Sequence, residues 1–142
     1  MIGAATTIHA VDKDKSSLAQ LKQAYQTRFG NTDNLQIQVG DFSRVVELPP
    51  LDALIAPNSL HYFKDRVKIL EHIKSLLKTN GKLIVIEYNV DSGNPWVPYP
   101  FTFQTFGKLA KQSGFTEPQL LATYPSSFLR EFYSALTFKA DS

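Results

Sequence analysis

Cysteine is absent from this sequence of 142 residues, and no run of apolar residues approaches the length that spans a bilayer. Without cysteine there is no disulfide framework and no thiolate site for zinc or an iron–sulfur cluster. The three histidines are too scattered along the chain to predict a metal site. A transmembrane helix needs about 20 apolar residues, so no membrane span is predicted. These absences favour a soluble protein in a reducing, cytoplasmic compartment.

A block of like charge is also lacking. The formal net charge is +2, from 15 Lys and Arg against 13 Asp and Glu, and the two signs are interspersed. Nucleic-acid and membrane-surface partners therefore receive no support, because such partners select for clustered charge. The length fits one domain over residues 1–142, which is long enough to bury roughly 70% of its extended surface.

The first third of the chain predicts a strand, a helix and a second strand. An apolar run ends in Asp12, and apolar residues then recur at helical spacing until Gly30, with Ser16 and Ser17 as candidate helix caps. Residues 35–39 alternate apolar and polar side chains and end in Gly40-Asp41, which predicts a strand.

The remainder predicts four more strands and two more helices. The expected strands are 51–56, 82–88, 119–124 and 132–138, and the expected helices run from Val67 to a stop at 79–81 and from a Thr102 cap to Ser113. The β-branched run of 82–88 is predicted to be buried on both faces. Residues 89–100, rich in proline, form a loop that carries Trp96 and Tyr99.

This order of elements predicts a three-layer α/β fold, with a mainly parallel Rossmann-like sheet and a C-terminal antiparallel hairpin. Ligands of such sheets bind beyond the carboxyl ends of the strands. The polar residues at those ends are Asp12, Asp41, Asn58 and Glu87.

The motifs at these strand ends, taken in order, resemble the class I S-adenosylmethionine-dependent methyltransferases. The resemblance runs from about Ile8 to Ala140. It rests on Ala10-Val11-Asp12, Gly40-Asp41-Phe42, Leu51-Asp52-Ala53-Leu54 through Asn58-Ser59-Leu60-His61-Tyr62, Leu77 to Leu83 around Asn80-Gly81, and Gly114-Phe115.

The resemblance implies S-adenosylmethionine as the cofactor and a small molecule as the methyl acceptor. Asp12 would accept hydrogen bonds from the ribose hydroxyls, and Asp41 would receive the adenine amino group, with Phe42 packing near the ring. Asn58 would line the methionine end of the cofactor.

The acceptor side would be formed by Tyr62 and by Trp96 and Tyr99 of the long loop, with Phe101 as a further candidate. Methyl transfer needs close, oriented approach and often a base that removes a proton from the acceptor. His61 is the candidate for that base, because an unperturbed imidazole has a pKa of about 6.5.

Each of these assignments has a structural alternative. Asp12 is then a solvated acid at a strand end, and Asp41 is a turn residue after Gly40. His61 is then a hydrogen-bonded pocket wall, and the Trp96 loop is a hydrophobic plug rather than an acceptor pocket. Glu87 is either a second acid or base, or a solvated or lysine-paired carboxylate.

The chain departs from the family at its start. The family's first strand, which lies in the middle of the sheet and ends in a glycine-rich turn, has no counterpart, and residues 1–6 resemble the end of the helix that would follow that turn. Exposed edges inside a sheet are costly. Either the strands near 7–12 and 51–56 pair directly, or a second copy of the chain covers the edges as a homodimer.

Two functional hypotheses follow. One is a methyltransferase-type domain, truncated at its N-terminus, whose activity in this chain is impaired or absent. The other is a non-catalytic remnant of the fold that binds itself or another partner.

Overall fold

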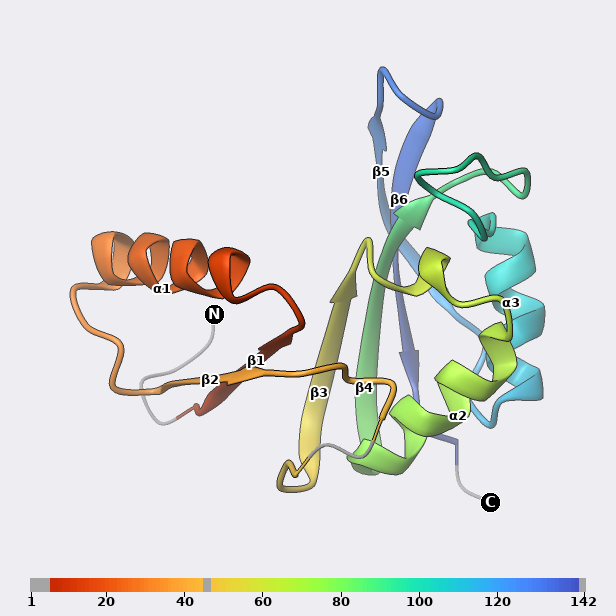
Figure 1. The fold of residues 1–142 in the computed structure, drawn as a ribbon. Coiled ribbons are helices and arrows are strands. Elements are labelled where there is room, and N and C mark those ends of the chain that lie inside the picture. The colour runs from red at the N-terminus through yellow and green to blue at the C-terminus, as the bar shows by residue number, and fades with distance from the viewer. Residues whose placement is uncertain (1–5, 45–46, 141–142) are drawn as a thin grey trace. The chain divides into compact units, whose positions relative to one another are not determined.

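The computed structural model describes residues 6–44 and 47–140. The chain divides into two compact units, Met1–Leu48 and Pro49–Ser142 (Figure 1). Within the described ranges, no helix has both the length and the apolar character needed to cross a membrane. The helix end expected at 1–6 falls almost entirely outside these ranges.

Unit one, Met1–Leu48, is a strand–helix–strand motif. It contains β1 (Ile8–Asp12), α1 (Lys15–Phe29) and β2 (Leu35–Val39), and β1 and β2 pair in parallel with Ile8 opposite Leu35. All three elements were predicted from the apolar periodicity.

The predicted N-cap of α1 is wrong, and its predicted C-terminal end is confirmed. Asp14, and not Ser16 or Ser17, is the N-cap: its carboxylate accepts hydrogen bonds from the Ser16 N–H at 3.0 Å and the Ser17 hydroxyl at 2.7 Å. Asp is as good a cap as Ser, and both serines serve here as its donors. The helix ends, as predicted, at Gly30, whose φ of 81° is accessible to glycine at little cost.

Unit two, Pro49–Ser142, is built on a four-stranded sheet of order β3-β4-β6-β5. The β3–β4 pair is parallel and the other two pairs are antiparallel. Its elements are β3 (Leu51–Pro57), η1 (Leu60–Tyr62), α2 (Arg66–Leu76), β4 (Leu77–Tyr88), α3 (Phe103–Gln112), β5 (Gln119–Pro125) and β6 (Glu131–Phe138). The predicted mixed α/β architecture, with parallel strands followed by a C-terminal antiparallel hairpin, is confirmed.

The helices α2 and α3 lie on the same side of this sheet (Figure 1). Leu83, Val85 and Glu87 of β4 are fully buried, whereas the alternating residues Ile84 and Ile86 are only half-buried. The prediction that this strand is buried on both faces is therefore wrong. The reason is that, among the described residues of unit two, both α-helices lie on one face.

The junction between α2 and β4 also differs from the expectation. The helix ends at Leu76 rather than at 79–81, and β4 begins at once with Leu77 opposite Leu51. The next paired residues are Ala53 and Lys82, so four residues of β4 bulge out between the two pairings. Asn80, with φ of 62°, turns the chain inside this bulge, which explains why the Asn-Gly signal lies within a strand.

The outer edges of β1 and β3 were predicted either to pair with each other or to be covered by a second chain. Among the described strands, β1 pairs with β2 alone and β3 with β4 alone, in two separate sheets. Direct pairing of the two strands is therefore not found.

Candidate active site

The carboxylates of unit one lie at one end of its small sheet. Asp12 is the last residue of β1, and Asp41 comes two residues after the end of β2. The two ends are joined by a hydrogen bond of 2.9 Å from the Gly40 N–H to the Asp12 carbonyl. Because the strands are parallel, both carboxylates are delivered to the same edge.

Asp12 is exposed, and its Oδ1 accepts a hydrogen bond of 2.9 Å from the Asp14 N–H. Asp41 is half-buried, and its Oδ1 accepts from the Ser43 hydroxyl at 2.6 Å and the Ser43 N–H at 3.0 Å. These hydrogen bonds, the hydroxyl first, lower the pKa of Asp41 from its ordinary value, with smaller help from nearby Lys13 and Arg44. Asp41 thus lies in a turn, as the structural alternative for this residue predicts. Its carboxylate is still a charged acceptor of hydrogen bonds.

In unit two, β3 is followed by Asn58 in a left-handed conformation with φ of 52°. Its N–H donates to the Ile86 carbonyl of β4 at 2.8 Å. Its side-chain Oδ1 is buried and has no hydrogen-bond partner among the described residues. A buried amide oxygen without a donor is costly, so this atom is suited to a donor from a bound molecule.

The short helix η1 then places His61 against the end of β4. Its Nδ1 lies 2.7 Å from Glu87 Oε1, and its backbone N–H donates to Glu87 Oε2 at 3.2 Å. The exposed fractions of the two side chains are 2% and 0%. Glu87 therefore binds both the ring and the main chain of His61, which is a defined buried pair rather than a chance surface contact.

This pair favours one tautomer of a neutral histidine ring. When a carboxylate oxygen accepts a hydrogen bond from Nδ1–H, the lone pair of the neutral ring is on Nε2. Nε2 is itself buried, with no partner among the described residues. A basic nitrogen without a partner, backed by a carboxylate, is the arrangement of a general base and its orienting group.

The long loop over residues 89–102 holds the other side of His61. The Tyr99 N–H donates to the His61 carbonyl at 2.8 Å. The loop is itself secured by the Arg66 guanidinium, which donates to the Pro100 carbonyl at 3.1 Å. Its tip is held by Asn94, whose Oδ1 accepts from the N–H groups of Trp96 and Val97.

The aromatic residues predicted for the acceptor side differ in exposure. Tyr62 is 60% exposed and its ring contacts that of His61 at 4.3 Å, while Trp96 is 71% exposed. Tyr99 is exposed and reaches His61 through its backbone. Phe101 is only 1% exposed and packs on Phe106, so this residue belongs to the core and not to a pocket.

The predicted residues are thus brought together in two groups. Unit one carries Asp12, Asp41 and the half-buried Phe42, and unit two carries Asn58, His61, Tyr62, Trp96 and Tyr99. The structure rules out the reading of Glu87 as a solvated or lysine-paired acid. Sequence reasoning missed its pairing with His61, although Leu83, Val85 and Glu87 alternate along one buried face, a pattern that marks a buried acid.

Solved structures with this fold include methyltransferases. Human N-acetylserotonin methyltransferase in complex with SAM gives a TM-score of 0.65 at 20% identity, covering 95% of this chain and 41% of that chain. CurJ carbon methyltransferase gives a TM-score of 0.67 at 16% identity, covering 99% of this chain and 50% of that chain. The chain thus spans half or less of the length of each.

A sequence relative is the highly reducing polyketide synthase PKS2 of Leptosphaeria maculans. It is 53% identical over 36 residues, which is 25% of this chain and 1% of that protein. The model of the family described as "Methyltransferase domain" matches residues 2–83, more than half of the sequence. This match contains β1 to β3, the His61 turn and α2. The chain therefore belongs to the methyltransferase-domain family.

Proposed function

We propose that this chain forms the core of an S-adenosylmethionine-dependent methyltransferase acting on a small molecule, with His61 as the general base and Glu87 as its positioning residue. The buried His61–Glu87 pair carries the proposal, because a hydrogen bond from Nδ1 to Glu87 puts the lone pair of the neutral ring on Nε2, which has no partner among the described residues. A cytoplasmic setting is also proposed, on the basis of the absence of cysteine.

The residues of unit one fit the cofactor. Asp12 and Asp41 stand at one sheet edge, as acceptors for ribose hydroxyls and an amino group, and Phe42 follows Asp41 beside them. When bound, S-adenosylmethionine supplies an electrophilic methyl group. The lowered pKa of Asp41 keeps its carboxylate ionised at neutral pH, as this role requires.

The acceptor atom is proposed to be a carbon made acidic by neighbouring carbonyl groups. A polyketide synthase among the relatives and a carbon methyltransferase among the similar folds support this choice. Nε2 of His61 would take the proton of the acceptor C–H bond and leave its electron pair on the carbon. That pair would bond the methyl group that the cofactor would supply, while the cofactor's sulfur would keep the electron pair of the broken sulfur–methyl bond. Glu87 stabilises the resulting imidazolium through its 2.7 Å contact with Nδ1.

A transfer assay with a 3-oxoacyl thioester of pantetheine tests this proposal. Because the activity of this chain alone is proposed to be impaired, the assay follows residual transfer over long incubations. We expect one methyl group on the carbon between the two carbonyls, detected by mass spectrometry, and a residual rate that falls to the background without protein in His61→Ala. His72→Ala is the matched control, since His72 is the second histidine of unit two. Unchanged transfer in His61→Ala would contradict the base assignment.

We further propose that the activity of this chain alone is impaired or absent. The family resemblance assigns the methionine end of the cofactor to a glycine-rich turn, and the sequence contains no such turn. Calorimetric titration with S-adenosylmethionine tests this point: heat with a submicromolar Kd would contradict impairment. We also propose that residues 1–142 fold as one domain, for which a single thermal transition is expected.

The second candidate is a non-catalytic module that self-associates. It is favoured by β3, whose outer edge has no strand partner among the described residues. Such an edge is a template for another strand, which supports a homodimer through the sheet edges. Light scattering is expected to give twice the monomer mass, and a strictly monomeric protein at high concentration would exclude this arrangement.

A further inference from the structure

An aromatic row leads away from His61 on the acceptor side and defines a surface with no assigned role. We propose that this row, made of Tyr88, Phe132 and Phe128, binds the apolar chain of the methyl acceptor, and that Phe128 is a specificity-determining residue for chain length. The inference rests on the proposed function, since it takes His61 as the base.

The row is continuous by ring contact. The His61 ring lies 6.0 Å from that of Tyr88, the last residue of β4. Tyr88 stacks on Phe132 of β6 at 4.3 Å and meets Phe128 at 6.0 Å, edge to face. The row therefore begins at the proposed base and ends on the turn between β5 and β6.

The turn fixes Phe128 in an exposed position. The Ser126 hydroxyl oxygen accepts hydrogen bonds from the N–H groups of Phe128 at 3.2 Å and Leu129 at 3.4 Å. The turn is closed by a bond of 2.9 Å from the Ser126 N–H to the Arg130 carbonyl. Phe128 is nevertheless 52% exposed, so a pre-ordered turn holds about half of an aromatic side chain in solvent.

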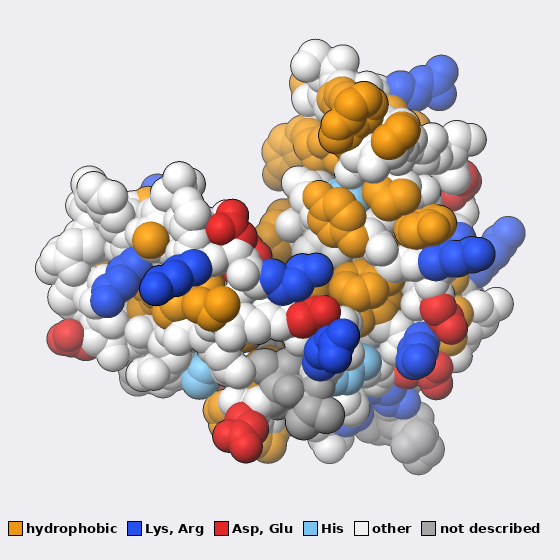
Figure 2. All heavy atoms as spheres, in the orientation of Figure 1, with side chains coloured by type: hydrophobic (Ala, Val, Ile, Leu, Met, Phe, Trp, Pro, Cys, Tyr) orange, Lys and Arg blue, Asp and Glu red, His pale blue; other side chains and the backbone are white. Residues whose placement is uncertain are grey.

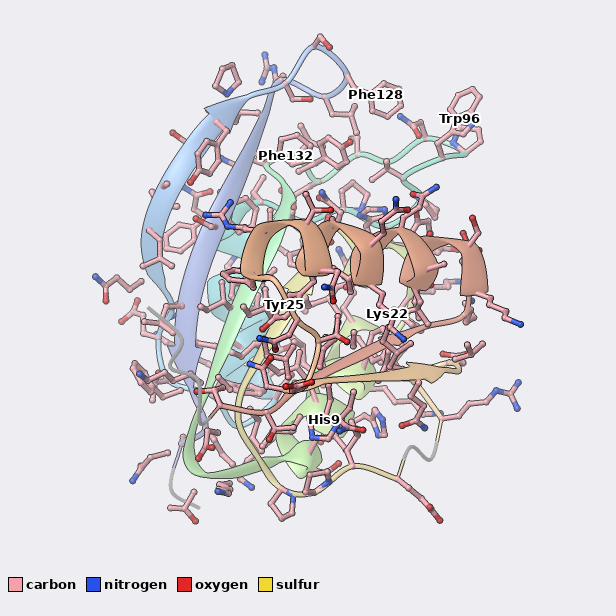
Figure 3. The ribbon with its side chains drawn as sticks, turned by 90° about the vertical axis from the view of Figure 1, so that its left-hand side faces the viewer. His9, Lys22, Tyr25, Trp96, Phe128 and Phe132 are labelled. Atoms are coloured by element: carbon pink, nitrogen blue, oxygen red, sulfur yellow. The ribbon has the colours of Figure 1, made fainter. Side chains whose placement is uncertain are left out.

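The row lies at the end of unit two where β4 finishes. Figure 3 shows Phe128 and Phe132 toward this end, and Trp96 of the long loop toward the same end. In Figure 2, hydrophobic side chains gather over this part of unit two. Exposed apolar side chains that are grouped beside a candidate base are typical of a ligand-binding surface, whereas a single exposed apolar side chain is ordinary.

The chemistry of the row selects its occupant. None of its three side chains carries a charge. The two acids adjacent to the row in sequence are already bound: Glu87 lies 2.7 Å from His61 Nδ1, and Glu131 accepts from the Asn89 side-chain amide at 2.6 Å. An anionic acceptor would find no cationic partner among these rings, whereas an acyl chain would bury its methylene groups against them. We therefore commit to an unbranched acyl thioester with its reactive end at His61.

Binding of pantetheine thioesters to the full chain, followed by calorimetry without S-adenosylmethionine, tests the inference. We expect the octanoyl thioester to bind more tightly than the acetyl thioester. In Phe128→Ala the octanoyl affinity should fall roughly tenfold while the acetyl affinity is unchanged, because only the longer chain reaches the turn. Phe29→Ala is the matched control, since Phe29 of α1 is similarly exposed at 58%.

The inference is overturned if neither thioester binds, if Phe128→Ala weakens both equally, or if Phe29→Ala has the same effect. Circular dichroism of each variant shows whether the fold is kept, and Phe128→Leu should retain most of the octanoyl affinity. Chain-length-dependent binding together with methyl transfer that His61→Ala leaves unchanged would overturn His61 as the base and leave this surface in place. Methyl transfer with a KM that is independent of chain length would support the proposed function and overturn the inference about Phe128.

Discussion

The hydroxyl group of Tyr133 donates a hydrogen bond of 2.8 Å to the backbone carbonyl of Phe101, deep in unit two. Both residues are at most 1% exposed. Burial raises the pKa of the Tyr133 hydroxyl above its ordinary value, and the charges of Glu87 and Asp91 raise it further. Tyr133 therefore stays protonated and ties β6 to the loop that supports His61.

Removal of that hydroxyl is expected to destabilise the protein. Tyr133→Phe leaves the buried Phe101 carbonyl without its donor, which costs about 1–3 kcal/mol. Urea unfolding followed by circular dichroism measures the loss. Tyr124→Phe is the control, because Tyr124 is 53% exposed and its hydroxyl can bind water instead. Equal stability of the two variants would show that the bond contributes nothing.

Asp91 is expected to make stability depend on pH through the start of α3. Its Oδ1 accepts from the Thr102 N–H at 3.0 Å. Burial alone would raise the pKa of Asp91, but hydrogen bonds from Thr102 and Thr105 outweigh burial and lower it. A lowered folded-state pKa contributes stability above the unfolded value of about 3.9, and this stability is lost as the pH falls through the folded value.

The measurement for Asp91 is the difference in Tm between the unaltered chain and Asp91→Asn. We expect the unaltered chain to be more stable at pH 7 and the difference to shrink steadily below pH 4. Asp33→Asn, at an exposed acid of unit one that takes no part in the start of α3, is the control. A Tm difference that is constant with pH would contradict the assignment.

Glu87→Gln should lower kcat for methyl transfer by about 10²–10⁴-fold while leaving the affinity for S-adenosylmethionine unchanged. The amide oxygen of glutamine can still accept from Nδ1 of His61, but an NH2 group replaces the oxygen that accepts from the His61 N–H, and the negative charge that stabilises the imidazolium is lost. Circular dichroism checks that the variant keeps the fold. Glu117→Gln, at the exposed partner of Lys111, is the control. A change confined to KM would assign Glu87 to binding instead.

Asp12→Ala is expected to lower the affinity for S-adenosylmethionine at least tenfold, because charge-assisted hydrogen bonds to the ribose hydroxyls are lost. Calorimetry measures this affinity. Acyl thioester binding should be unaffected, since every residue of the aromatic row belongs to unit two. Asp33→Ala serves as the matched acid of the same unit. If both variants bind the cofactor as the unaltered chain does, Asp12 is the solvated acid of the structural alternative.

Periodicity predicted most of the fold because local patterns decide strands and helices here. The strand–helix–strand order of unit one and the hairpin of β5 and β6 followed from alternation and from turn residues. The start of β4 did not, because Asn80-Gly81 is equally suited to end a helix and to turn a bulge. Which of these occurs depends on the pairing of Leu77 with Leu51, a contact between distant parts of the chain.

The site was predicted less completely for the same reason. His61 was singled out from the sequence by its chemistry and stays a prediction, whereas its pairing with Glu87 spans 26 residues and requires the parallel register of β3 and β4. The ring contacts of the aromatic row were also missed. Phe128 is near Tyr88 only because β6 returns beside β4 with Phe132 opposite Tyr88.

The hydrogen bond from the Tyr99 N–H to the His61 carbonyl makes one backbone amide a reporter of the proposed base. The exchange rate of this proton with deuterium measures how often the long loop separates from η1. Slow exchange that slows further when an acyl thioester is added would reveal a histidine held in place before its acceptor arrives. NMR measurement of this exchange rate in each variant would distinguish two kinds of variant. One kind loses only the chemical step, and in the other the long loop no longer holds η1.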